Sequence, residues 1–374
     1  MTKILILANN DVGLYKFRKE LIESLLDQGY EVYISLPAGY YVEKLCHMGC
    51  VFFDTPIDRR GTNPITDLKL IFYYKTLIKN IKPDVLLTYT IKPNVYGGIA
   101  CKATNTPYLA NVTGLGTSVE NEGVLQKITL TLYKHGLKKA ACVFFQNETN
   151  RQFFIDKHIV TGKTRLIPGS GVNLKYHCFE EYPDSDNIIK FLFIGRIMKD
   201  KGIDELLEAA QKVKCMYPNV QFDLVGYCEE NYTKRLSDFE NRGIIKYHGQ
   251  QDDVHSFIKG AHAIIHPSYH EGMANVLLEA ASTGRPVLAS NIPGCRETFD
   301  EGVSGYGFEV KNTAALVNTI EKFIRLPYKN KKQMGIAGRA KVECEFDRQI
   351  VIDSYMEEIN KILNMYQRKA GTVI

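Results

Sequence analysis

Residues 263–284 read AIIHPSYHEGMANVLLEAASTG, an apolar run followed by a polar loop and a second apolar segment. The run at 263–267 predicts a short buried strand, and residues 274–283 predict a helix that Gly284 closes. The loop therefore opens onto a helix N-terminus, where unpaired backbone N–H groups and a partial positive charge suit a diphosphate. This unit predicts a parallel α/β fold with a ligand site at the carboxyl end of a strand.

Two glutamates of this stretch, Glu271 and Glu279, have seven residues between them. Glu271 lies in the loop, where its carboxylate can bond a sugar hydroxyl, and Glu279 lies about two helical turns later, where it can reach a ribose. Because carboxylates suit polyols and not phosphates, the pair indicates a sugar-nucleotide site. The alternative is that Glu279 is a solvated helix carboxylate and Glu271 a capping acid.

A second motif, FLFIGRIMKDKG at residues 191–202, carries two cations. Its apolar strand ends at Gly195, and Arg196 and Lys201 flank a turn before a helix that begins near Ile203. Two cations at the carboxyl end of a strand can neutralise a leaving diphosphate. The alternative for this motif alone is a solvated basic loop.

Together the two motifs resemble the retaining GT-B glycosyltransferases of family four, and the resemblance extends over nearly the whole chain. Shorter matching pieces are Leu224-Val225-Gly226, His248-Gly249-Gln250, Pro267-Ser268, Gly284-Arg285-Pro286-Val287 and Gly294-Cys295-Arg296-Glu297. Such a series in order is far more specific than any one member.

The resemblance implies roles for individual residues. Arg196 and Lys201 would hold the donor diphosphate, and Glu271 would approach the donor sugar, so these three form the implied catalytic set. Glu279 would bind the ribose, and backbone amides of the intervening loop would contact the phosphates or the sugar. The implied donor-binding residues are Arg196, Lys201, Gly226, Gln250, Glu271, Gly272, Met273, Ala274, Asn275 and Glu279.

The length of 374 residues, at ~150 residues per domain, predicts two or three domains. Each half alternates strands and helices, as doubly wound sheets do. The pattern breaks into glycine around residues 169–173 and into a polar stretch at 180–187. As in GT-B proteins, we expect two Rossmann-like domains facing a cleft and a final helix that crosses back. The expected segments are 1–170 for the acceptor, 171–345 for the nucleotide sugar, and 346–374 for a helix packing on the first domain.

Strands of the first half are expected at residues 3–8, 31–36, 51–53, 84–89, 108–112 and 142–145. A loop at 9–13 and a helix at 15–28 follow the first strand. Because the donor motifs lie in the second half, the first half should hold the acceptor. In the loop, Gly13 stands where many family members have a glycine pair. At the start of the helix, Lys16 and Arg18 can meet an acceptor phosphate, or are solvated first-turn cations.

Thr113 and Gly114 follow a strand and face the same edge of the first sheet. Many family members place a histidine in this neighbourhood, where Thr113 stands here, so no catalytic histidine is assigned. The resemblance implies front-face attack with retention, in which a donor phosphate oxygen takes the acceptor proton. The enzyme would then mainly position the reactants and stabilise the leaving diphosphate.

The chain contains nine cysteines without a C-x-x-C pair, which indicates neither a disulfide framework nor a zinc site. Asp184-Ser185-Asp186 spells a D-x-D motif, but it lies in a polar linker and not at the end of an apolar strand. With Arg196 and Lys201 available for the diphosphate, we expect no metal requirement and no cofactor. No apolar run approaches the ~18 residues needed to span a bilayer, and we expect the chain in the cytosol.

The net charge of +5 gives nucleic-acid binding no support. Its distribution is more informative, because residues 69–82 and 124–142 mix lysines with apolar or aromatic residues and contain no acid. Basic amphipathic helices of this kind can rest on anionic lipid. The alternative is a helix with one face buried and the other solvated.

Residues 14–18 (LYKFR), 58–64 (DRRGTNP) and 113–116 (TGLG) narrow the resemblance to the bacterial branch that builds capsule, O-antigen and N-glycan repeat units. Members of that branch commonly add a sugar, often an N-acetylhexosamine from a UDP donor, to undecaprenyl-diphosphate-linked saccharides. Arg59 and Arg60 would then be candidates for the acceptor diphosphate, although an arginine pair in a loop is often simply solvated.

The leading hypothesis is a metal-independent retaining glycosyltransferase that acts peripherally at the inner face of the cell membrane. It would move a sugar from a UDP-sugar to a polyprenyl-diphosphate-linked saccharide. A UDP-N-acetylglucosamine 2-epimerase-like enzyme and an inactive nucleotide-sugar-binding scaffold are the alternatives. The donor sugar, the acceptor, the linkage, the choice of UDP over GDP and the oligomeric state stay open at this point.

Overall fold

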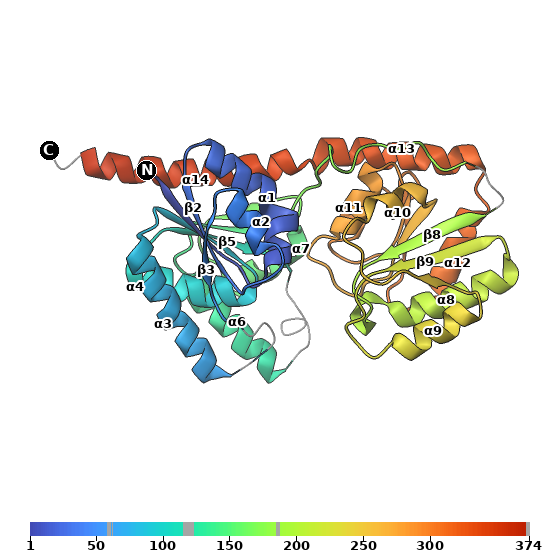
Figure 1. Cartoon of the computed structure of the whole chain (residues 1–374), viewed down its shortest axis with the longest axis horizontal. Helices are drawn as coiled ribbons and strands as arrows, with labels where there is room; N and C mark the ends of the chain where they lie inside the picture. The colour runs from blue at the N-terminus through green and yellow to red at the C-terminus, as the bar shows by residue number, and fades with distance from the viewer. Residues whose placement is uncertain (58–60, 62, 115–122, 185–187, 372–374) are drawn as a thin grey trace. The chain divides into compact units, whose positions relative to one another are not determined.

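The computed structural model describes residues 1–57, 61, 63–114, 123–184 and 188–371. The chain divides into two compact units (Figure 1). Unit 1 comprises Met1–Ser170 together with Gln349–Ile374, and unit 2 comprises Gly171–Arg348. In the described ranges, no helix is both long and apolar enough to cross a bilayer.

Unit 1 is built on a parallel sheet with the strand order β3-β2-β1-β4-β5-β6-β7. The strands are β1 Lys3–Leu7, β2 Glu31–Leu36, β3 Val51–Asp54, β4 Val85–Tyr89, β5 Tyr108–Val112, β6 Cys142–Phe145 and β7 Thr164–Leu166. Every residue of β4, β5 and β6 is buried, as parallel strands covered on both faces require. The order reverses between β1 and β4, which makes this a doubly wound sheet.

Helices cover both faces of the unit 1 sheet. They are α1 Asp11–Asp27, α2 Val42–His47, α3 Pro64–Ile81, the π-helical turn η1 Pro93–Gly97, α4 Gly98–Thr104, α6 Val124–Leu137, α7 Glu148–Asp156 and α14 Arg348–Gly371. One apolar core lies under α1 and α14, and the other lies under α3, α4, α6 and α7. The final helix α14 thus completes the core of the unit that begins the chain.

Tyr355 anchors α14 in unit 1. Its ring lies 4.4 Å, centroid to centroid, from the ring of Phe144 in β6. Its hydroxyl accepts a hydrogen bond from Nδ2 of Asn111 in β5 at 2.6 Å. At the edge of the helix, Lys163 forms a 2.6 Å ion pair with Glu358, whose side chain is buried. Burial of the helix and these polar contacts fix the end of the chain to the sheet.

Unit 2 contains a second parallel sheet with the order β10-β9-β8-β11-β12-β13. Its strands are β8 Ile189–Ile194, β9 Val220–Val225, β10 Lys246–Tyr247, β11 Ala263–His266, β12 Val287–Ser290 and β13 Gly305–Phe308. Its helices are η2 Lys199–Lys201 and η3 Arg296–Thr298 (both 3-10), α8 Ile203–Met216, α9 Thr233–Asn241, α10 His255–Gly260, α11 Asn275–Ser282, α12 Thr313–Ile324 and α13 Tyr328–Glu345. The two sheets confirm the predicted α/β class.

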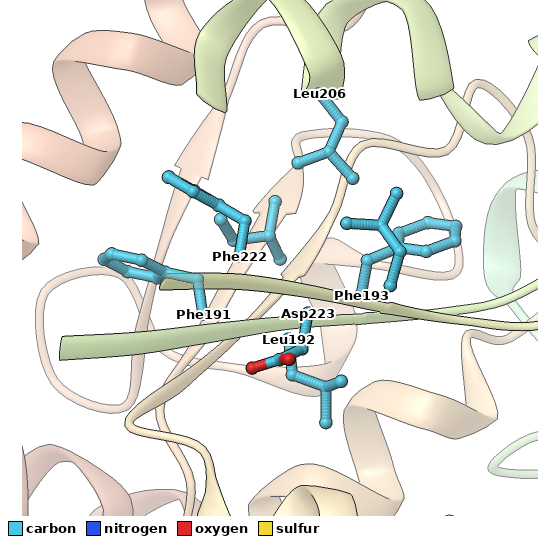
Figure 2. A pocket seen from close by; sticks show the side chains of 8 residues that line it. Phe191, Leu192, Phe193, Leu206, Phe222 and Asp223 are labelled. Atoms are coloured by element: carbon cyan, nitrogen blue, oxygen red, sulfur yellow. The ribbon is translucent and has the colours of Figure 1, made fainter. Parts of the chain in front are cut away.

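The core of unit 2 follows the alternation of side chains along β8 and β9. Figure 2 shows Phe191, Phe193 and Phe222 on the face of the sheet that Leu206 of α8 covers, with Leu192 on the opposite face. The rings of Phe191 and Phe222 stack with centroids 5.3 Å apart. This rigid core holds the carboxyl ends of both strands in a fixed position.

One expectation about helices was wrong, and one helix was not anticipated. Helix α1 begins at Asp11 and not at Tyr15, because the side chain of Asn10 caps it by accepting from the N–H of Gly13 at 2.6 Å. Gly13 therefore lies in the first helical turn and not in a loop. Helix α13, which follows the second sheet, was not anticipated.

Candidate functional site

The candidate donor site lies at the carboxyl edge of the unit 2 sheet. Strands β9, β8 and β11 are neighbours in the parallel order, so the segments that follow them begin side by side. Gly226 follows β9, Gly195 and Arg196 follow β8, and the loop to α11 follows β11. In an open parallel sheet this edge is where ligands collect.

Two glycines allow these segments to approach one another closely. Gly226 has φ +148°, and a Cβ there would lie 1.8 Å from the carbonyl oxygen of Gly195. Gly202, which has φ +70°, brings the η2 turn against the loop after β11, so that a Cβ would lie 2.1 Å from the carbonyl oxygen of Pro267. No larger residue fits either position without moving backbone. The glycines thereby bring Lys201, next to Gly202, close to the Glu271 loop.

Glu271 is held by two side chains from two different segments. Lys201 Nζ forms an ion pair with Glu271 Oε1, and each side chain is 15% exposed. His266 Nε2, at the end of β11, contacts the same oxygen at 2.8 Å, and its side chain is only 3% exposed. The structure therefore brings together two of the three predicted catalytic residues and adds His266 to them.

The electrostatics of this cluster keep Glu271 ionised. Burial by itself raises the pKa of the carboxyl, but the charge of Lys201 and the hydrogen bond and charge of His266 outweigh burial. The net pKa of Glu271 lies far below its usual range. A carboxylate that stays charged accepts hydrogen bonds from sugar hydroxyls and stabilises positive charge, but it does not donate a proton.

Arg196 has a carboxylate partner of its own. Its Nη1 lies 2.6 Å from Oε2 of Glu229, and the arginine side chain is 42% exposed. Glu229 follows β9 by four residues and was not singled out in the sequence. Arg196 and Lys201, the two predicted diphosphate ligands, thus each lie beside a glutamate.

The N-terminus of α11 has no side-chain cap. Ala274 is the residue at this end, and its own N–H donates to the carbonyl of Gly294 at 2.8 Å. The Ala274 amide therefore already has a backbone acceptor in this structure, and its predicted contact with the donor stays a prediction. Gly272 and Met273 are buried in the loop before it, and Asn275 begins the helix. Their contacts with the donor stay predictions.

The remaining predicted donor residues also lie in unit 2. Glu279 is half-buried in the second turn of α11, where its Oε1 lies 4.0 Å from Nε2 of His177. Gln250 is exposed just after β10. The preceding residue, Gly249, accepts a 2.8 Å hydrogen bond from the N–H of Gly226, which places Gln250 at the same sheet edge.

The predicted acceptor residues of unit 1 lie in or after elements of the first sheet. Lys16 is exposed on α1, and Thr113 and Gly114 follow β5. Arg18 was expected in the first turn as a phosphate ligand or a solvated cation, but it lies two turns into α1 and is 4% exposed. Its guanidinium packs on Tyr89 and Tyr355, whose ring centroids lie 5.0 and 6.0 Å away, so the solvated alternative is wrong.

Several residues that the sequence singled out lie outside the described part of the chain. They are Arg59 and Arg60 of the predicted acceptor loop, and Ser185 and Asp186 of the D-x-D motif. The acceptor role of the arginines therefore stays a prediction.

Two doubly wound parallel sheets, with cations and carboxylates at the carboxyl edge of the second, define a GT-B glycosyltransferase. The family comparison gives the same result: residues 179–341 match the model of the group 1 glycosyl transferases, and residues 3–147 match a glycosyl transferase 4-like model. The chain belongs to the group 1 glycosyltransferases and is an enzyme that transfers sugar.

Two named relatives match most of the chain. The chain is 28% identical, over 96% of its own length and 98% of the relative, to the N,N'-diacetylbacillosaminyl-diphospho-undecaprenol alpha-1,3-N-acetylgalactosaminyltransferase of Campylobacter jejuni. It is 25% identical, over 72% of its length and 73% of the relative, to the UDP-Gal:alpha-D-GlcNAc-diphosphoundecaprenol alpha-1,3-galactosyltransferase of Escherichia coli.

Solved structures agree with the fold. A glycosyltransferase from Rickettsia africae superposes with a TM-score of 0.78 at 21% identity, covering 97% of this chain and 98% of that one. The structure of Anabaena Alr3699/HepE in complex with UDP and glucose also superposes with a TM-score of 0.78, at 18% identity, covering 96% of this chain and 100% of that one. At these identities the likeness establishes the GT-B fold alone.

Proposed function

We propose that the protein is a retaining, metal-independent glycosyltransferase that moves an N-acetylhexosamine from a UDP-sugar to a polyprenyl-diphosphate-linked saccharide. The observation that carries the proposal is the cluster of Glu271, Lys201 and His266 at the carboxyl edge of the unit 2 sheet. Two cations for a diphosphate and an ionised carboxylate for a sugar are the groups that transfer from a nucleotide sugar requires.

In this proposal Arg196 and Lys201 offset the negative charge that develops on the leaving diphosphate. Each cation lies beside a glutamate at the carboxyl edge of the unit 2 sheet, and a bound diphosphate would become a further anionic partner of both. Lys201 and His266 hold Glu271 in its ionised form. Its carboxylate accepts a hydrogen bond from a hydroxyl of the donor sugar and stabilises positive charge near the reacting carbon of that sugar. With two protein cations at the diphosphate, the step requires no divalent ion.

The choice of acceptor follows the relatives. The names of those from C. jejuni and E. coli both describe a sugar added to a saccharide on undecaprenyl diphosphate. Both names also state an alpha linkage, which fits retention when the sugar nucleotide is itself alpha-linked. We assign acceptor binding to unit 1, with Gly13, Lys16, Thr113 and Gly114 as the described candidates.

A lipid-linked acceptor requires contact with a membrane, and unit 1 carries a surface suited to it. Six large apolar side chains on α3 and α6 are at least half exposed: Ile65, Leu68, Phe72, Val124, Leu125 and Ile128. Exposed lysines on the same two helices include Lys69, Lys79, Lys127 and Lys134. Both helices pack on the η1 turn. We call these residues the apolar–basic patch and assign it to the anionic inner face of the cell membrane.

Measuring nucleotide release from a panel of UDP- and GDP-sugars in EDTA tests the donor side of the proposal. Release of UDP from one donor, only when lipid-linked saccharides are added, is the expected result. Loss of activity in EDTA that Mg²⁺ or Mn²⁺ restores would contradict metal independence. Conversion of free UDP-sugar into its epimer without acceptor would instead identify an epimerase, and UDP binding without turnover would identify a scaffold.

A further inference from the structure

Three metal-binding side chains meet in unit 2 apart from the donor cluster. Cys178 and Glu180 lie in the segment that precedes β8, and His255 is the first residue of α10. One ligand atom from each residue lies within 4.8 Å of the others, which is the one such group of three among the described residues. Because His255 follows Glu180 by 75 positions, the sequence alone gives no sign of this cluster.

Two of the three separations between ligand atoms are close to those of a tetrahedral transition-metal site, and all three are within 4.8 Å. Cys178 Sγ lies 3.9 Å from Glu180 Oε1, and His255 Nε2 lies 3.2 Å from the same oxygen. Tetrahedral zinc, with bonds of about 2.3 Å to sulfur and 2.0–2.2 Å to nitrogen and oxygen, separates such ligand pairs by about 3.4–3.6 Å. Closing the three ligands around one ion would require the sulfur and the imidazole to come within about 3.6 Å of each other.

A buried arginine fixes the two halves of the cluster to each other. Arg285 is fully buried, and its Nη1 donates to the carbonyl of Glu180 at 3.0 Å. Its Nε and Nη2 donate to the carbonyls of Ile258 and Lys259 in α10, at 3.2 and 2.8 Å. The segment that carries Cys178 and Glu180 is thus tied to the helix that carries His255. A site held in this way loses little entropy when an ion binds.

Lys259 competes with a metal for Glu180. Its Nζ forms a 2.9 Å ion pair with Oε2, whereas the other oxygen, Oε1, faces the sulfur and the imidazole. The lysine side chain is 59% exposed, so it can move into solvent at little cost. Cys178 is exposed as well and leaves the ion a path into the cluster.

We infer that Cys178, Glu180 and His255 form a binding site for a zinc-class transition-metal ion, with water as the fourth ligand. One thiolate, one imidazole and one carboxylate are the donors that Zn²⁺ and Co²⁺ accept, and they are unlike the all-oxygen sites of Mg²⁺ and Ca²⁺. The thiol releases its proton when the metal binds. A metal ion bound here would stabilise the folded state of unit 2. None of the three ligands is a proposed donor-binding residue, so sugar transfer would not require the ion.

Titration of the metal-free protein with Co²⁺, in a phosphine reductant, tests the site independently of sugar transfer. A thiolate-to-cobalt absorption band that saturates at one equivalent and disappears on addition of Zn²⁺ is the expected result. Zn²⁺ should also raise the Tm of the parent. Absence of the band at stoichiometric cobalt would overturn the assignment.

Variants identify the ligands. Cys178→Ser should abolish the band, and His255→Asn should weaken metal binding by more than about tenfold. Cys215→Ser, which replaces another exposed cysteine on α8, is the matched control and should bind as the parent does. A band that survives in Cys178→Ser, or that is lost equally in Cys215→Ser, would show that cobalt binds elsewhere. The Tm of each variant without metal confirms that it is folded.

Discussion

Lys201 and Glu271 form an ion pair across 70 positions of sequence, and each side chain is only 15% exposed. The pair joins the turn after β8 to the loop after β11, and His266 contacts the same carboxylate oxygen. Without donor, the charge of Lys201 is therefore balanced by a carboxylate. In the proposed function, a bound diphosphate would be a second anionic partner for this lysine, and the Glu271 carboxylate would face the sugar.

Replacing Lys201 with alanine should reduce kcat/KM by about 100-fold, because the leaving diphosphate loses a charged partner that is positioned in advance. UDP should also bind about tenfold more weakly. Steady-state kinetics and calorimetric titration with UDP measure the two effects. Lys199→Ala is the matched control, since Lys199 is an exposed lysine in the same 3-10 turn and should change either value less than about twofold. Equal effects of the two variants would contradict the assignment.

Replacing Glu229 with glutamine should tighten UDP binding about two- to fivefold. The reason is that Glu229 holds Arg196 in a partly exposed ion pair, and its removal frees the guanidinium for the diphosphate. Titration with UDP at low and high salt measures the gain, which screening should reduce. Glu208→Gln, an exposed glutamate on α8, serves as the control. Weaker UDP binding in Glu229→Gln would show that Glu229 positions Arg196 for the donor instead.

The Glu271 ion pair should make a pH-dependent contribution to stability. Because the folded pKa of Glu271 lies below the unfolded value of 4.5, its contribution is fully present above pH 4.5 and is lost as the pH falls. We expect the free energy of unfolding of the parent to exceed that of Glu271→Gln by about 3 kcal/mol near neutral pH. The difference in Tm between the two proteins should then shrink below pH 4.5. A difference that stays constant down to pH 3 would contradict this account.

The apolar–basic patch predicts binding to anionic vesicles. The double variant Phe72→Ser and Leu125→Ser should weaken binding to vesicles rich in phosphatidylglycerol by at least about 100-fold in co-sedimentation, because each buried apolar side chain contributes about 1.5–3 kcal/mol. Leu166→Ser, which replaces an exposed leucine of β7, should leave binding unchanged. Activity on a water-soluble acceptor should be retained in both variants. Equal binding by parent and double variant would exclude this surface as the membrane contact.

Six of the seven strands of unit 1 were predicted because their signal is local, whereas the three-residue strand β7 was not anticipated. Each buried parallel strand is a short apolar run between polar segments. The strand expected at residues 31–36 has the same first and last residues as β2. Helix α13 escaped prediction because its packing face carries Gly335 and Gly338, which read as breaks in a helical pattern. In the fold, Gly335 lies against the backbone of Gly284, where a Cβ would come within 2.0 Å of the carbonyl oxygen.

Side-chain partnerships were harder to predict than elements. The sequence indicated Lys201 and Glu271 separately, through their motifs, but their ion pair depends on the order of the strands. Glu229 lay outside every motif, and only the adjacency of β8 and β9 brings it to Arg196. Arg18 was misjudged for a related reason: a cation near a helix start is usually solvated, whereas here Tyr89 and Tyr355 enclose it. Such contacts are properties of the tertiary fold.

Transfer of radiolabelled sugar from the UDP-sugar into the organic-extractable lipid fraction, compared between the parent and Glu271→Gln in EDTA, tests the central claim most directly. The parent should label a polyprenyl-diphosphate saccharide with retained configuration. Glu271→Gln should lose at least about 100-fold in rate while keeping the parent's circular dichroism, and Glu208→Gln should remain active. Wild-type labelling by Glu271→Gln, or transfer by the parent only with added divalent metal, would contradict the account.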